Sequence, residues 1–215
     1  MFSALVWVAG LGYSHEPDKQ PAGAVAKDDE AQDIIVLERQ RAATLDKLID
    51  QMYDAAYEAY LEGDYERSIV RFETAQALNA DRMQFWHKLA LSYAYITTGR
   101  YPQGERLAKQ LIEERPLHWE AYWHVGMAAL WQKKFKDALR FLEMAADFEA
   151  HEPTVSFYLG MAYELTGQNK LAQKYYSEAE QKYQAIISNN PEDEQACIEL
   201  ARALLYQDKK LGRVL

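Results

Sequence analysis

Small residues and turn residues recur every 34 positions through much of the chain, and this spacing constrains the fold more than any other feature. Gly99, Lys133 and Gly167 are 34 residues apart, as are Gly126 and Gly160. Apolar residues between them recur at steps of three and four, which is typical of amphipathic helices. A fixed period of this length predicts a helical solenoid, in which each helix pair buries its apolar face against the next. We therefore expect an all-α fold.

The first repeat departs from this spacing. Gly63 precedes Gly99 by 36 residues, which predicts a two-residue insertion, and we place it around Thr97 and Thr98. After Ala179 the last helical segment continues toward Pro191, so we expect a longer second helix there.

The repeated segments resemble the tetratricopeptide (TPR) repeat, which combines a large residue, a Leu-Gly/Ala pair, a Tyr, a turn Gly, further aromatic and Ala positions and a final Pro. The resemblance covers residues 45–210 and implies a right-handed α-solenoid of about four hairpins with capping helices. The residues that carry it are Ala55, Ala56, Gly63, Tyr65, Phe72 and Ala75, then Trp86, Leu89, Ala90, Tyr93, Gly99, Tyr101 and Pro116, then Tyr122, Val125, Gly126, Phe135, Ala138 and Ala145, then Leu159, Gly160, Tyr163, Gly167, Ala172, Tyr176 and Ala179.

The chain divides on this basis into five parts. Residues 1–12 are an apolar segment, and residues 13–33 are expected to form a flexible acidic linker, since six acidic residues and two lysines in residues 1–33 leave −4 of the net charge of −9. We expect an N-terminal capping helix at 34–48, TPR-like repeats at 49–190 and a C-terminal capping helix at 191–215.

Residues 1–12 are too short to span a bilayer, but their length fits the apolar core of a secretory signal. No lysine or arginine precedes Lys19, so the alternatives are an uncleaved tail or an anchor whose start lies upstream. We expect a periplasmic or otherwise exported protein, with a cytoplasmic one as the alternative. Membrane contact is expected only through this segment, if it is retained.

The resemblance also predicts a binding groove, because the first helices of TPR repeats line a concave surface on which peptides dock. Large exposed aromatic patches mark interaction sites. The alternative is that these rings pack inside a tightly wound solenoid. The predicted groove residues are Tyr53, Tyr57, Tyr60, His87, Leu91, Tyr95, Trp123, Met127, Leu130, Trp131, Phe157 and Met161.

Composition argues against several other functions. The net charge of −9 disfavours a nucleic-acid partner, since phosphate binding needs a concentrated positive face. Cys197 is the single cysteine, which excludes an internal disulfide, and we expect it to be buried on an amphipathic helix. No histidine pair has the spacing of a zinc helix, and no Gly-rich phosphate loop occurs. We expect no catalytic residues, no metal and no cofactor.

These observations favour a non-catalytic scaffold or adaptor that binds a protein or peptide and assists the assembly of a bacterial envelope complex. The groove lacks the basic residues that would clamp an acidic C-terminus, so an apolar segment fits it better. The alternative is a cytosolic chaperone, because the repeat region is similar to the TPR chaperones of type III secretion translocators. An enzyme would require a further domain or a hidden site. A homo-oligomer is left open.

Overall fold

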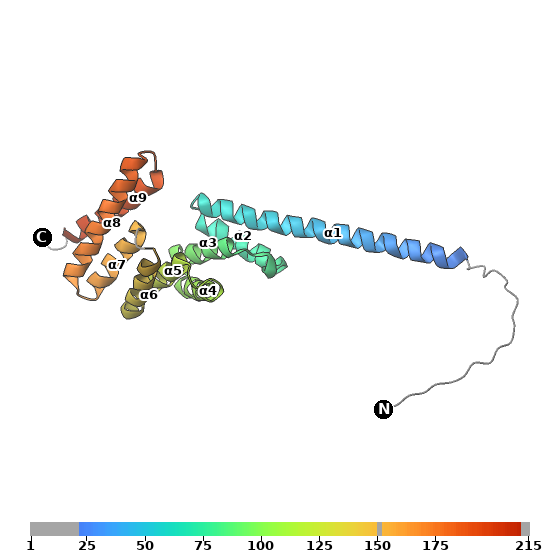
Figure 1. Cartoon of the computed structure of the whole chain (residues 1–215), viewed down its shortest axis with the longest axis horizontal. Coiled ribbons are helices and arrows are strands. Elements are labelled where there is room, and N and C mark those ends of the chain that lie inside the picture. The colour runs from blue at the N-terminus through green and yellow to red at the C-terminus, as the bar shows by residue number, and fades with distance from the viewer. Residues whose placement is uncertain (1–21, 150–151, 212–215) are drawn as a thin grey trace, which may run out of the picture. The chain divides into compact units, whose positions relative to one another are not determined.

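The computed structural model describes residues 22–149 and 152–211, and the side-chain packing of residues 32–149 and 152–205. Within these ranges the chain is helical apart from turns and short loops (Figure 1). It divides into two compact units between Asp46 and Lys47. The elements are α1 (Ala22–Leu61), α2 (Tyr65–Leu78), a short 3-10 helix η1 (Ala80–Arg82), α3 (Phe85–Thr97), α4 (Tyr101–Glu114), α5 (Trp119–Trp131), α6 (Phe135–Phe148), α7 (Pro153–Leu165), α8 (Asn169–Asn189) and α9 (Glu194–Leu211).

The predicted all-α solenoid of helical hairpins is confirmed. Helices α3 and α4, α5 and α6, and α7 and α8 form successive hairpins that pack against one another, and the end of α1 packs with α2 (Figure 1). The first helices α3, α5 and α7 begin at Phe85, Trp119 and Pro153, so they repeat every 34 residues. The period seen in the sequence is therefore the length of one hairpin with its connections.

The two-residue insertion lies elsewhere than predicted. Six residues, 79–84, connect α2 to α3 and include η1, whereas four residues connect α4 to α5. Thr97 ends α3 as Trp131 ends α5, and Thr98 caps the helix as Gln132 does. The insertion is thus in the loop between hairpins, where Asn79 starts the extra turn by accepting a hydrogen bond from the backbone N–H of Asp81.

The predicted linker and the predicted N-terminal capping helix are also wrong as separate parts. Residues 22–61 form one helix, α1, so residues 22–33 are helical and no break occurs near residue 48. Neither glycine nor proline occurs between Gly23 and Gly63, and alanine, leucine and charged residues with good helix propensity fill the interval. Ile34, Ile35 and Leu45 are about half exposed on this helix. The predicted segment 1–12 lies outside the described residues.

Close approach of the two helices holds each hairpin together. A Cβ atom at Gly126 would lie 2.6 Å from Cγ of Leu142, and one at Gly160 would lie 2.6 Å from the ring of Tyr176. In the second hairpin Ser92 stands at the position equivalent to Gly126, and the close approach is at Gly104 of α4, where a Cβ atom would lie 2.5 Å from Cγ1 of Ile96 and 2.9 Å from the backbone oxygen of Ser92. The Ser92 hydroxyl donates a hydrogen bond to the Gly104 carbonyl oxygen at 3.1 Å.

The predicted long second helix is present. Helix α8 has 21 residues, whereas α4 and α6 have 14 each. Its buried residues Ala172, Tyr176, Ala179 and Tyr183 continue one face, and α9 packs against it. Among the described helices, none combines the length and the apolar character that crossing a membrane requires.

Turns within the hairpins use the left-handed backbone region. Gly63, Gly99 and Gly167 have φ between 77° and 82°, whereas Lys133 occupies the equivalent position with φ of 61°. For a residue with a Cβ atom this conformation costs about 1–2 kcal/mol. The lysine turn therefore carries backbone strain that the glycine turns avoid.

We expect Lys133→Gly to raise the free energy of unfolding by about 0.5 kcal/mol, because relief of strain exceeds the greater freedom of glycine in the unfolded chain. Gly99→Ala is the matched control and should lower it by about 1 kcal/mol, since nothing lies within 4 Å of the added methyl group and only the backbone is affected. Urea denaturation followed by circular dichroism measures both. Changes of the same sign in the free energy of unfolding of the two variants would contradict this account.

Candidate functional site

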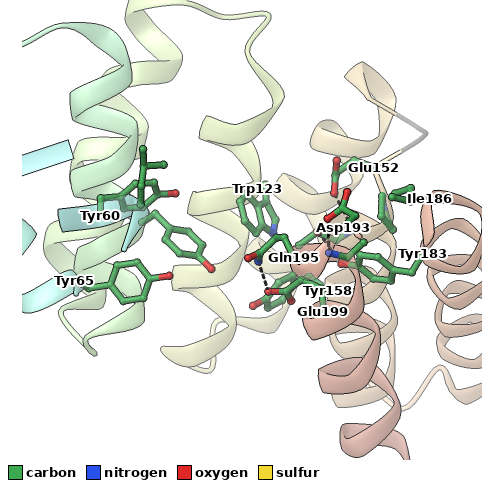
Figure 2. A pocket seen from close by; sticks show the side chains of 15 residues that line it. Tyr60, Tyr65, Trp123, Glu152, Tyr158, Tyr183, Ile186, Asp193, Gln195 and Glu199 are labelled. Atoms are coloured by element: carbon green, nitrogen blue, oxygen red, sulfur yellow. Dashed lines mark hydrogen bonds between the residues drawn. The ribbon is translucent and has the colours of Figure 1, made fainter. Parts of the chain in front are cut away.

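A cavity of about 500 Å³ lies among residues of α1, α2, α3, α5, α7, α8 and α9. The first helix of every hairpin contributes to it, and α8 and α9 close its other side (Figure 2). Within residues 47–205 the side chains around it are largely aromatic or acidic. They are Tyr60, Leu61, Tyr65, Tyr93, Trp123, Glu152, Pro153, Thr154, Tyr158, Tyr183, Ile186, Asp193, Gln195, Ala196 and Glu199.

Five aromatic rings form a continuous row along one wall. Tyr60, Tyr65 and Tyr93 contact one another with ring centroids 5.8–5.9 Å apart. Tyr93 then lies 5.6 Å from Trp123, and Trp123 lies 6.0 Å from Tyr158. These separations are typical of favourable aromatic pairs. The row joins α1, α2, α3, α5 and α7, so the stacking of hairpins builds the wall.

Three phenols of this wall, those of Tyr60, Tyr93 and Tyr158, stay protonated near neutral pH. Burial raises the pKa of Tyr93 to about 12, with a further increase from Tyr65 and a partial decrease from Arg202. Burial likewise raises the pKa of Tyr60 and of Tyr158 above the ordinary tyrosine value. The wall therefore presents neutral hydroxyl groups and aromatic faces.

Three carboxylates line the cavity from the side of α7 and α9 (Figure 2). Glu152 caps α7 by accepting a hydrogen bond from the backbone N–H of Thr154, and Asp193 accepts one from the backbone N–H of Ala196. Glu199 accepts hydrogen bonds from Gln195 and from Arg202. The first two carboxylates thus have positions set by helix ends.

Glu199 and Arg202 form an ion pair with a shortest distance of 2.8 Å. Burial raises the pKa of Glu199, and Arg202 opposes that increase. Burial disfavours the charged form of Arg202, but electrostatic interactions, first with Glu199 and then with Tyr93, Tyr158 and Tyr65, outweigh it and raise the pKa of Arg202. Arg202 therefore places its guanidinium close to the aromatic row while neutralising one of the three carboxylates.

Most of the predicted groove residues lie in the core instead of an open groove, which corrects that prediction. Seven of the twelve predicted residues are at most 7% exposed. Tyr53 stacks on His87, with ring centroids 5.4 Å apart, inside the packing of α1, α2 and α3. The buried ones are Tyr53, His87, Leu91, Met127, Leu130, Phe157 and Met161.

Misplacing the insertion explains the error in α3. His87, Leu91 and Tyr95 are 36 residues before Trp123, Met127 and Trp131, whereas the helices themselves repeat every 34. A shift of two residues rotates a helix position by about 200° and moves it to the opposite face. In α5 and α7 the cause differs, because each first helix is covered by the hairpin on either side and Met127 and Met161 fill that contact.

The remaining predicted residues have separate positions. Tyr60 and Trp123 line the cavity as predicted. Tyr57 stacks on Tyr60 with ring centroids 5.7 Å apart, just behind the cavity wall. Tyr95 donates its hydroxyl hydrogen to Glu73. Trp131 is 47% exposed and lies beside Tyr101, away from the cavity.

Sequence reasoning missed Tyr65, Tyr93, Tyr158, Tyr183 and the carboxylates. From the sequence, Tyr93 is placed only among the residues of the repeat pattern, although its ring also faces the cavity. An alignment of α3 with α5 at a spacing of 34 residues would have placed Tyr93 at the position equivalent to Met127, on the predicted groove face. No sequence signal showed that Tyr183 and Glu199 close the site, because that depends on how α8 and α9 fold back.

Other chemistry is sparse in the described part of the chain. There, no group of three or more His, Cys, Asp or Glu side chains is arranged to hold a metal ion. Cys197 is exposed, which differs from the expected buried position. The Trp123 indole N–H is buried and meets no acceptor among the described side chains.

His124 lies directly behind the aromatic row. Its ring is 5.6 Å from Tyr93 and 5.1 Å from Trp123, and 4% of the residue is exposed. Burial, together with an electrostatic contribution from His118, lowers the pKa of His124 to about 3. The folded chain therefore keeps this imidazole neutral, whereas the unfolded chain protonates it near pH 6.5.

We expect the free energy of unfolding to fall as the pH drops from about 6.5 toward 3, because over this range the unfolded state binds a proton that the folded state rejects at His124. Between pH 7.5 and 5.0 this contributes a loss of about 2 kcal/mol. His124→Phe should remove that part of the loss, as measured by urea denaturation at each pH. Parallel pH profiles for the two proteins, or a His124 ring proton that titrates near pH 6.5 in NMR spectra, would contradict the assignment.

Comparison with known proteins supports the repeat assignment. Residues 89–153 match the tetratricopeptide repeat family. No sequence among curated proteins matches the chain. A structure of MamA from Desulfovibrio magneticus RS-1 superposes with a TM-score of 0.56 at 15% identity, over 64% of this chain and 76% of that one. A structure of MamA from MSR-1 superposes with a TM-score of 0.53 at 20% identity, over 75% of this chain and 98% of that one.

A third structure is described as a TPR protein. TTC0263, a thermophilic TPR protein of Thermus thermophilus, superposes with a TM-score of 0.53 at 16% identity, over 73% of this chain and 99% of that one. At these identities the likeness concerns the fold. Together with the matched repeats and the 34-residue spacing of α3, α5 and α7, it shows that this chain has the fold of tetratricopeptide-repeat proteins.

Proposed function

We propose that this chain is a non-catalytic scaffold that binds a protein or peptide partner in the aromatic cavity. The observation that carries the proposal is the row of five rings from Tyr65 to Tyr158, which lines an open cavity of about 500 Å³. Tyrosine and tryptophan dominate the binding energy of protein interfaces, because they bury much surface at a low entropic cost.

The shape of the site supports a segment of polypeptide as the ligand. The cavity extends across α1, α3, α5 and α7, so an occupant contacts several hairpins at once. Its walls offer hydroxyl groups, carboxylates and apolar surface together, which suits the mixed chemistry of a peptide. Leu61 at its edge is 67% exposed, so this side chain is within reach of a bound segment.

A photo-reactive amino acid in place of Leu61 should cross-link a partner in the cells that produce the protein. Val70 on α2 is the matched control, because it is also an exposed aliphatic residue, at 59%, and does not line the cavity. We expect a cross-linked product identified by mass spectrometry at Leu61 and none at Val70. Equal cross-linking at both positions, or at neither, would refute binding in the cavity.

A second measurement tests cavity binding without the cross-linker. Tyr65→Ala together with Tyr158→Ala should reduce the recovery of that partner at least about tenfold, because two rings of the row are lost. Trp131→Ala, at an exposed aromatic residue outside the cavity, should leave recovery unchanged. Thermal denaturation of each variant separates lost binding from lost folding.

We further propose that the protein acts after export, where it assists the assembly of an envelope complex. The apolar run of residues 1–12 supports this, and it lies outside the described residues. N-terminal sequencing of protein from cell fractions should find a mature chain that begins near Tyr13 or Ser14. A chain that retains Met1 in the cytosol would instead favour the cytosolic chaperone.

A further inference from the structure

We propose that the cavity recognises a positively charged side chain, arginine or lysine, on the segment that the partner inserts. This inference rests on the proposed function and adds the chemistry of the occupant. The combination of aromatic rings and carboxylates around the same cavity carries it (Figure 2).

The aromatic wall provides one half of a cation site. Cations are attracted to the faces of tryptophan and tyrosine rings within about 6 Å, and the attraction grows when water is excluded. Tyr60 and Tyr65 face the cavity from one side, and Trp123 lies between them and α9 (Figure 2). This wall therefore attracts a cation through its ring faces.

The acidic wall provides the other half. Glu152, Asp193 and Glu199 line the cavity, and no lysine or arginine is among the described lining residues. Arg202, just behind them, neutralises one of these charges through its ion pair with Glu199. Glu152 and Asp193 accept hydrogen bonds from helix-end N–H groups and remain as the two carboxylates available to an incoming cation.

The chain itself shows that a guanidinium is compatible with this environment. Arg202 pairs with Glu199, one of the carboxylates that line the cavity, at a shortest distance of 2.8 Å. An incoming arginine would repeat this arrangement with Glu152 and Asp193. The 500 Å³ cavity has room for such a side chain and its neighbouring backbone.

Charge also distinguishes between the possible occupants of the cavity. Residues 1–33 carry six acidic residues and two lysines, so the N-terminal part of the same chain is repelled by the carboxylates. A second copy of the chain, with a net charge of −9, is disfavoured for the same reason. A basic segment of another protein is the occupant that the charges favour.

The test uses the full chain and a terminally blocked pentapeptide with a central arginine flanked by alanines. The NMR signal of the Trp123 indole N–H, assigned with Trp123→Phe, reports on the cavity. We expect the peptide to shift this signal with saturation, and increasing salt to weaken binding. The matched peptide with citrulline, which has nearly the same shape without the charge, should bind at least about tenfold more weakly.

Glu152→Gln combined with Asp193→Asn removes both charges and keeps an oxygen that can cap each helix. We expect it to weaken arginine-peptide binding about tenfold, since two partly exposed charge contacts are lost. The control, Glu113→Gln with Asp147→Asn, makes the same change in net charge outside the cavity and should leave binding unchanged.

Several outcomes would overturn the inference. These are equal binding of the citrulline peptide, no effect of the double substitution, no peptide-induced shift, or a Trp123 signal that moves with protein concentration alone, which would show a second copy in the cavity. If cross-linking at Leu61 still captures a partner in any of these cases, the proposed function stands and the cationic side chain is wrong.

Discussion

The rest of the fold depends on the close approach of the two helices within each hairpin. Leu142 occupies the space where Gly126 lacks a side chain, and Tyr176 does the same at Gly160. In the second hairpin Ile96 of α3 occupies the space where Gly104 of α4 lacks a side chain, and the Ser92 hydroxyl donates a hydrogen bond to the Gly104 carbonyl oxygen. In the first hairpin the Ser68 hydroxyl donates to the carbonyl oxygen of Ala56 at 2.9 Å. Different residue pairs thus achieve the same close approach, because the combined volume at the contact decides how near the helices come.

The packing of the hairpins also sets the chemistry of the cavity wall. Successive hairpins bring their first helices side by side, and the centroids of rings on neighbouring first helices are then 5.6–6.0 Å apart. The aromatic row is therefore a product of stacking. The same packing desolvates neighbouring polar groups, which keeps His124 neutral and leaves the Trp123 N–H without an acceptor among the described side chains.

The sequence predicts the hairpins well and the cavity poorly, for a physical reason. Helix-forming patterns, turn glycines and small residues at contacts are local signals, and they correctly predict α3 to α8 and the long α8. The face that each helix presents depends on register, and a two-residue error at Thr97 is enough to turn His87 and Leu91 from the core to the groove. The separate helix at 34–48 is predicted from the need to cover an open end, although no residue in the sequence breaks α1 there.

The length of helix α8 has a consequence for how the repeat array can change in length. If the spacing of Phe85, Trp119 and Pro153 continued, the next first helix would begin at residue 187, but α9 begins at Glu194, seven residues later. Seven residues are close to two full turns, so Ala172 and Ala179, like Tyr176 and Tyr183, stay on one face despite the added length. The first 14 residues of α8 end at Lys182, and Tyr183 and Ile186, which line the cavity, belong to these two turns. A repeat protein can therefore acquire a binding pocket by inserting whole helical turns, a change of length that preserves the existing core and leaves every older contact in phase.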